Sequence, residues 1–252
     1  MRRRLGFTLF EVIIYMAIFA LTGMLIASIF QITRRTQESS SAAHAVSGES
    51  DTAVRWLRQD LQDTALGSVR TFPGTSGLSP AASMCSARTV DPGTRGKMLV
   101  SEYGVLRWRK HVVYGFQRKS ASSKVGNLIR WEVPLSDAEV EQRVPRFLPA
   151  LPTSSTHERV ILHNVMAPGS SVSGLSGVGT LTADKDWGGF KVQFFRRNTG
   201  SAELDPSDVS PALNLDTPEF NSRLVNVELA IAETMMARPN VYRIRFRVCP
   251  RY

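Results

Sequence analysis

The hydrophobic and polar positions first define a long apolar segment near the N-terminus. From Phe7 to Phe30 only Glu11 is charged, and most of the other side chains are apolar. An α-helix rises about 1.5 Å per residue, so this segment would form a helix of about 36 Å, enough to cross the hydrocarbon core of a bilayer. The pattern therefore predicts a membrane-spanning helix.

Helical spacing continues beyond the apolar segment. No proline or glycine occurs from Leu25 to Ser47, whereas Gly48 is compatible with either a continuous helix or a break. From about Asp51 to Leu66, apolar side chains recur at helical spacing between charged and polar ones: Val54, Leu57, Leu61 and Ala65. We expect this part to form an amphipathic helix whose apolar stripe packs on a sheet.

The rest of the chain has the pattern of β structure after an irregular connection. Phe72–Gly96 is rich in Pro, Gly and Ser, which predicts a connection without regular structure. Short alternating segments with β-branched and aromatic residues then predict strands at Lys97–Ser101, Val105–Trp108, His111–Arg118, Asn127–Val133, Arg159–Val165, Phe190–Arg196, Leu224–Ile231 and Tyr242–Val248. One long helix followed by such strands predicts an α+β fold with a mostly antiparallel sheet and long irregular loops.

The N-terminal segment differs from a cleavable secretory signal. Such a signal has an apolar core of about 7–15 residues followed by a small-residue cleavage site. Here the apolar run is longer, and the small residue between the basic cluster and that run is Gly6. Arg2, Arg3 and Arg4 should stay on the cytoplasmic side of the membrane under the positive-inside rule. Removal by an ordinary signal peptidase is therefore not expected.

The acidic residue in the apolar segment needs a physical explanation. A charged carboxylate inside a bilayer costs on the order of 3 kcal/mol, so an intramembrane acid normally has a partner or a function. A cut after Gly6 would create an amine four residues before Glu11 in the chain. An amine of this kind could offset the charge of the carboxylate.

These residues together resemble the class III signal of type IV prepilins and pseudopilins. The resemblance rests on Arg2–Gly6 followed by Phe7-Thr8-Leu9-Phe10-Glu11-Val12. It implies that a prepilin peptidase cuts after Gly6 and methylates the new N-terminal Phe7. It also implies that Glu11, at the fifth mature position, pairs with the terminal amine of a neighbouring subunit in a filament. The alternative is a plain signal anchor with a coincidental glutamate.

The same resemblance implies an organisation and a location. The chain would consist of a cleaved leader (1–6), a transmembrane and assembly helix (7–30), a periplasmic amphipathic helical part (31–71) and a periplasmic β-rich domain (72–252). It would be a single-pass protein of the bacterial inner membrane that enters a periplasmic or surface filament. Its partners would be the prepilin peptidase, the inner-membrane assembly platform, the major subunit and other minor pseudopilins or pilins.

Weaker patterns resemble the J-type minor pseudopilins of type II secretion systems and their pilus counterparts of the PilW kind. They are Trp56–Leu61, Val113–Arg118, Leu128–Arg130, Ile161–Val165, Val227–Ala230 and Tyr242–Arg245. Glu11 separates the chain from the K-type tip pseudopilin, which typically lacks this acid. The resemblance favours a subunit that helps initiate the pseudopilus tip. A minor pilin of a type IV pilus, acting in assembly, adhesion or DNA uptake, and a filament-carried binding module are the alternatives.

Charge does not point to a nucleic-acid site. The formal net charge of +9 falls to +6 when the three leader arginines are removed. The remaining basic residues alternate with apolar ones, as at Arg243, Arg245 and Arg247, which is typical of the solvent-facing side of a strand. We therefore expect no nucleic-acid partner.

The sequence contains few residues in arrangements that are typical of catalytic, cofactor or metal sites. The sequence has no G-x-S-x-G, H-E-x-x-H or G-x-x-x-x-G-K-[ST] motif, and its four histidines are scattered, so we expect no enzymatic activity. We also expect no cofactor. Acidic loop residues could supply calcium ligands but lack EF-hand spacing, which favours solvated turns: Asp184, Asp186, Asp205, Asp208 and Asp216.

The two cysteines, Cys85 and Cys249, are far apart in the sequence. In an oxidising periplasm they could form a disulfide that ties the C-terminal end to a middle loop. Two separate thiols are the alternative. A zinc site would need more suitably spaced ligands than the cysteines and histidines provide.

Overall fold

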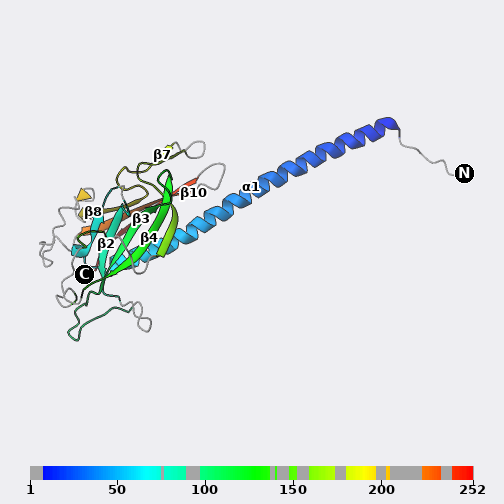
Figure 1. Cartoon of the computed structure of the whole chain (residues 1–252). Helices are drawn as coiled ribbons and strands as arrows, with labels where there is room; N and C mark the ends of the chain where they lie inside the picture. The colour runs from blue at the N-terminus through cyan, green and yellow to red at the C-terminus, as the bar shows by residue number, and fades with distance from the viewer. Residues whose placement is uncertain are drawn as a thin grey trace. The chain divides into compact units, whose positions relative to one another are not determined.

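A computed structural model of the chain describes residues 8–74, 77–88, 97–136, 140, 148–151, 159–173, 180–196, 203–204, 223–233 and 240–251. The chain divides into two compact units, Met1–Ser47 and Gly48–Tyr252. Helix α1 extends from Leu9 to Gln62 without a break at Gly48 (Figure 1). The helix is thus continuous at Gly48, where the sequence allowed an interruption. It ends at Gln62, four residues before Leu66, the predicted end of the amphipathic helix.

The second unit contains a nine-stranded antiparallel sheet in the order β1-β2-β3-β4-β5-β10-β8-β9, with β11 paired to β10. The strands are β1 (Arg70–Phe72), β2 (Ala81–Ser86), β3 (Lys110–Arg118), β4 (Val125–Pro134), β5 (Arg159–Met166), β8 (Phe190–Arg196), β9 (Glu203–Leu204), β10 (Arg223–Glu233) and β11 (Asn240–Val248). A separate hairpin pairs β6 (Ser171–Ser173) with β7 (Thr180–Thr182). A long apolar helix followed by an antiparallel sheet is the α+β, pilin-like arrangement that the sequence predicted.

Strand β10 organises the C-terminal half of the sheet. Residues 223–229 pair with β8, Ile231 pairs with Val165 of β5, and residues 225–233 pair with β11. Both edges of β10 are therefore occupied, and β5 and β8 follow one another along the same edge. This arrangement leaves β11 beside β10 at the margin of the sheet.

Six of the predicted strands are confirmed as β3, β4, β5, β8, β10 and β11, and β8 has the predicted bounds. The predictions at Lys97–Ser101 and Val105–Trp108 were wrong, because these segments form only isolated bridges, Arg88↔Met98 and Val100↔Leu106. The irregular connection predicted from Phe72 was also wrong over Ala81–Ser86. All six residues of that strand are buried, so it shows no alternation of polar and apolar positions.

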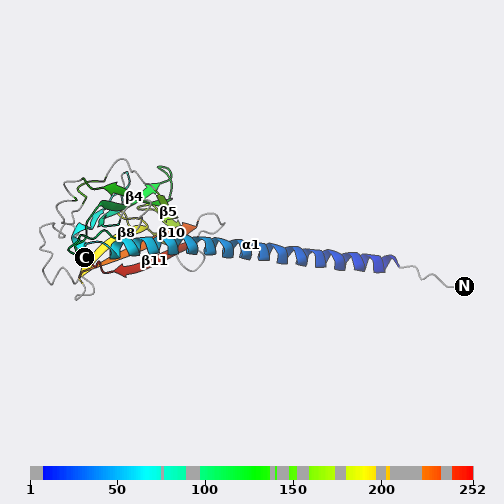
Figure 2. The same cartoon turned by 90° about the horizontal axis from the view of Figure 1, so that it is seen from below.

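Both faces of the sheet are covered in the second unit. The predicted apolar stripe of α1 supplies buried Leu57 and Leu61. On this side the guanidinium of Arg58 lies 5.7 Å from the centre of the Phe246 ring of β11, and Figure 2 shows α1 beside β11. On the other face Val113, Ile129, Trp131 and Leu148 form a buried cluster. The central strands are therefore buried on both sides.

The close packing of Gly115 against Trp131 of this buried cluster gives a stability prediction. A Cβ atom at Gly115 would lie 2.7 Å from the Trp131 ring and 2.8 Å from the carbonyl oxygen of Leu78. Gly115→Ala should therefore lower the free energy of unfolding by about 1–3 kcal/mol. Gly48→Ala is the matched control, because a Cβ atom at Gly48 would meet no atom within 4 Å and alanine should stabilise the helix by about 0.5–1 kcal/mol. Urea unfolding followed by tryptophan fluorescence measures both, and equal effects would contradict this packing.

Candidate functional site

The first turn of α1 fixes the position of the carboxylate of Glu11. The backbone N–H of Thr8 donates to Glu11 Oε2 over 2.9 Å, and the Thr8 hydroxyl donates to the same oxygen over 3.0 Å. In return, the backbone N–H of Glu11 points to Thr8 Oγ1 at 3.4 Å. This reciprocal arrangement is a capping box, in which a Thr-x-x-Glu sequence satisfies the open N–H groups at a helix N-terminus. The local sequence therefore explains both where α1 begins and how Glu11 is oriented.

Only one oxygen of this carboxylate is occupied within the described part of the chain. Both hydrogen bonds from Thr8 end on Oε2, and no described residue donates to Oε1. The Glu11 side chain is exposed. It is thus an oriented acceptor with an oxygen available to a group from outside the chain. Gly6 and Phe7, the predicted processing residues, lie outside the described residues, so their roles remain predictions.

The helix surface around and beyond Glu11 is apolar and exposed. Leu9–Glu38 is long and apolar enough to cross a membrane by length and composition, and none of its most apolar part is buried in the chain. The exposed fraction reaches 79% for Leu9 and 82% for Phe19. Exposure of such an apolar surface to water is unfavourable, so lipid or other apolar helices must cover it.

Polar side chains within this span are compatible with a lipid environment. The Thr22 hydroxyl donates to the carbonyl oxygen of Ile18 over 2.7 Å, and the Ser28 hydroxyl donates to that of Leu25 over 2.8 Å. A hydroxyl that bonds to its own helix does not need water. Glu11 is then the residue of the first turn whose charge requires an external partner.

The second unit contains a buried charged cluster around Asp60 of α1. Asp60 Oδ2 accepts hydrogen bonds from the Tyr114 hydroxyl at 2.5 Å and from Arg130 Nε at 2.8 Å. Arg130 Nη1 also donates to Glu132 Oε1 at 2.8 Å, and Lys110 Nζ lies 2.8 Å from Glu132 Oε2. We call these five residues the Asp60 cluster. It contains two acids and two bases, so its charges balance.

The electrostatics of the Asp60 cluster follow from its burial. Loss of water raises the pKa of Tyr114 well above its ordinary value, and the negative charge of Asp60 raises it further. Burial alone would lower the pKa of Arg130, but Asp60, Tyr114 and Glu132 outweigh burial and raise it. Tyr114 therefore stays neutral and Arg130 stays charged. The cluster holds the helix residue Asp60 against β3 and β4, which is a structural role.

The Asp60 cluster unites three of the weak sequence patterns. Asp60 belongs to Trp56–Leu61, Tyr114 to Val113–Arg118 and Arg130 to Leu128–Arg130. The guanidinium of Arg130 also lies 5.0 Å from the centre of the Trp56 ring. Sequence reasoning identified the patterns but missed that they meet. The sequence pattern placed Asp60 among the polar positions of the helix, and the available signal was its place at the border of the apolar stripe, three residues after Leu57.

Acid should weaken the second unit through Glu132. Burial raises the pKa of this carboxyl, but hydrogen bonds from Lys110 and Arg130 lower it more, so its folded pKa is below the ordinary value. The ionised group therefore stabilises the fold above the unfolded pKa of about 4.3, and this contribution is lost as pH falls through the folded pKa.

We expect the free energy of unfolding to change little with pH near neutrality and to decrease below about pH 4.5. Glu132→Gln should remove part of this acid dependence, whereas the exposed Glu102→Gln should not. Urea unfolding of the full-length protein in detergent at a series of pH values measures both. Identical pH profiles for the two variants would contradict the role of Glu132.

In the structure Cys85 and Cys249 are two separate thiols, which is the alternative to the possible disulfide. Cys85 is buried in β2, where its Sγ lies 3.5 Å from Nδ1 of His111. Cys249 is exposed just after the end of β11. The interpretation of Cys85 as part of a middle loop was therefore wrong, because Cys85 belongs to a fully buried strand of the sheet.

The other candidate ligands do not form a metal-binding group within the described ranges. The Asp184 carboxylate accepts hydrogen bonds from the backbone N–H groups of Asp186 and Trp187 and pairs with Lys191. Asp205, Asp208 and Asp216 lie outside the described residues. His163 Nδ1 lies 3.1 Å from Glu49.

Comparisons with known proteins address the N-terminal segment. Residues 1–27 match the family model described as the prokaryotic N-terminal methylation motif. The match supports a type IV prepilin-like protein that is a substrate of prepilin peptidase, and it covers the predicted cleavage site and the first turns of α1. No curated protein and no solved structure matched the chain.

Proposed function

We propose that the protein is a structural subunit of a type IV filament, stored in the bacterial inner membrane until it is assembled. One observation carries this proposal. A methylation motif over residues 1–27 leads directly into an exposed apolar helix whose first turn presents an oriented carboxylate at Glu11. A plain membrane anchor would need neither the motif nor the acid.

The proposed assembly step begins with cleavage after Gly6. Cleavage removes Arg2, Arg3 and Arg4 and leaves an amine at Phe7, and methylation of that amine keeps its positive charge. The Glu11 carboxylate of one subunit then pairs with the terminal amine of its neighbour. Pairing offsets the cost of an isolated charge in lipid, so an incoming subunit is favoured where the two groups meet.

The capping box has a direct use in this step. Because Thr8 holds Oε2 of Glu11, the carboxylate keeps one orientation while Oε1 can accept a hydrogen bond from the neighbour's amine. Less side-chain entropy is then lost on assembly than for a glutamate that rotates without restraint. Thr8 is thus proposed as a positioning residue for Glu11.

Within this class, we propose a J-type minor pseudopilin of a type II secretion system that helps initiate the pseudopilus tip. The supporting observation is that three J-like patterns meet in the Asp60 cluster. The globular domain would then lie in the periplasm, and the partners would be the major subunit, other minor pseudopilins and the assembly platform. A minor pilin of a type IV pilus shares the signal and fold plan and is the second candidate.

Deletion of the gene in the native host separates the two candidates. Loss of secreted proteins from the culture medium with normal surface pili supports the pseudopilin. Loss of pili with normal secretion supports the minor pilin. Normal secretion and normal pili together would contradict both, provided that the protein is produced in the parent strain.

A further inference from the structure

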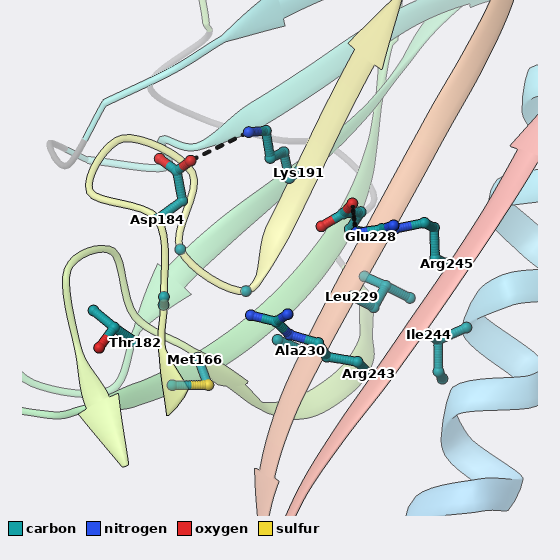
Figure 3. Close-up of a pocket in the computed structure, with 13 residues that line it drawn as sticks. Met166, Thr182, Asp184, Lys191, Glu228, Leu229, Ala230, Arg243, Ile244 and Arg245 are labelled. Carbon is teal, nitrogen blue, oxygen red and sulfur yellow. Dashed lines mark hydrogen bonds and ion pairs between the residues drawn. The ribbon is translucent and has the colours of Figure 1, made fainter. Parts of the chain in front are cut away.

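A pocket of about 550 Å³ lies beside the β10–β11 pair in the second unit (Figure 3). One side is formed by β10 and β11, and the other by Met166 and the segment Thr182–Lys191. The volume is within the range of about 300–1,000 Å³ that is usual for small-molecule sites. No part of the proposed assembly step uses this pocket.

The wall formed by the 182–191 segment is held by backbone contacts. The N–H groups of Gly169 and Gly188 both donate to the carbonyl oxygen of Asp184 over 2.9 Å. Gly188 has a φ of +61°, and a Cβ there would lie 2.7 Å from the backbone nitrogen of Pro168. Only glycine allows this approach, so the shape of the wall is set by the fold and does not depend on a ligand.

The charges that line the pocket do not cancel. Asp184 Oδ2 lies 3.2 Å from Lys191 Nζ, and Glu228 Oε1 lies 2.5 Å from Arg245 Nη2, so both acids are already paired. Arg243 has no ion-pair partner among the residues that the structure describes. In Figure 3 its guanidinium extends over Ala230 into the pocket. One positive charge is therefore left at the pocket.

We propose that this pocket binds a carboxylate group through the guanidinium of Arg243. The planar fork of a guanidinium can donate two parallel hydrogen bonds to a carboxylate. Ala230, which is partly exposed beside the guanidinium, supplies apolar surface for the rest of the ligand. Because Asp184 and Glu228 are paired, the pocket has one net positive charge. A singly charged carboxylate balances this charge and a phosphate dianion exceeds it, so the pocket selects the carboxylate.

Calorimetric titration of the full-length protein in detergent micelles tests this site. The probes are N-acetyl-leucine, its neutral amide, inorganic phosphate and an acetylated tetrapeptide that ends in leucine with its carboxylate. We expect the two carboxylates to bind at least about tenfold more tightly than the amide or phosphate. Tighter binding of the peptide than of N-acetyl-leucine would identify a protein segment as the source of the carboxylate. Equal binding of these two probes would identify a small molecule as the source. Absence of carboxylate binding, or equal binding of the amide, would overturn the proposal.

Variants of the pocket provide a second, independent test. Arg243→Gln should weaken carboxylate binding by about 10- to 100-fold, whereas Arg107→Gln, the same change at an exposed site outside the pocket, should have no effect. Glu228→Gln removes the acid paired with Arg245 and should strengthen binding. Unchanged affinity in Arg243→Gln, or weaker binding in Glu228→Gln, would overturn the assignment.

Discussion

Glu11→Gln should give a membrane-inserted, processed subunit that enters filaments at least about tenfold less often than the wild-type subunit. Glutamine can replace glutamate in a capping box, so the start of α1 should be kept while the charge is lost. The variant would leave the terminal amine of the neighbouring subunit without a partner charge in the membrane. An unpaired charge there costs on the order of 3 kcal/mol, equivalent to about a hundredfold in an equilibrium. Immunoblots of sheared or purified filaments, compared with the membrane fraction, measure the incorporated share.

Glu38→Gln is the matched control for Glu11→Gln. Glu38 is on the same helix but is exposed and pairs with Arg34 at 2.8 Å within the helix. Such a surface pair contributes only about 0.3–0.5 kcal/mol, so its loss should leave incorporation nearly unchanged. Wild-type incorporation of the Glu11 variant would contradict charge pairing, and an equal loss in both variants would indicate a general effect of removing acids from the helix.

Asp60→Ala should lower the free energy of unfolding of the second unit by about 3–5 kcal/mol. Asp60 is only 3% exposed and accepts hydrogen bonds from both Tyr114 and Arg130, so its removal leaves a buried guanidinium with one acid fewer and a buried hydroxyl without its acceptor. Urea unfolding of the full-length protein in detergent, followed by tryptophan fluorescence, measures the change.

Two further variants show whether the loss of stability in Asp60→Ala comes from the unbalanced charge in the Asp60 cluster. Asp51→Ala removes an exposed acid from the same helix and should change stability by less than about 0.5 kcal/mol. The double variant Asp60→Ala/Arg130→Met leaves the balanced Glu132–Lys110 pair and should recover part of the stability lost in Asp60→Ala. A double variant that loses the sum of both single effects would contradict this explanation.

The sequence predicted elements whose patterns are local. Length and apolarity identified the part of α1 that is long and apolar enough to cross a membrane. Alternating side chains identified β8 with its bounds, because such a pattern depends on one strand alone. Thr8 and Glu11 lie within one helical turn, so local sequence could also have predicted their capping box, which sequence reasoning missed. The α+β fold could therefore be expected before the structure.

The features that were missed depend on contacts between distant segments. Strand β2 has small residues and is buried on both faces by its neighbours, so it lacks the period of a half-buried strand. The pairing of Asp60 with Arg130 joins a helix to a strand 70 residues later. The pocket at Arg243 likewise forms only when β11, β10 and the turn at Asp184 come together.

The intact mass of the subunit, purified from cells that produce its prepilin peptidase, tests the central claim most directly. The proposed function predicts a chain that has lost residues 1–6 and gained one methyl group on Phe7. Gly6→Leu, produced in the same way, should keep the leader. A wild-type chain that retains its leader in the presence of an active peptidase, or that is cut after the apolar segment, would contradict the assignment as a filament subunit.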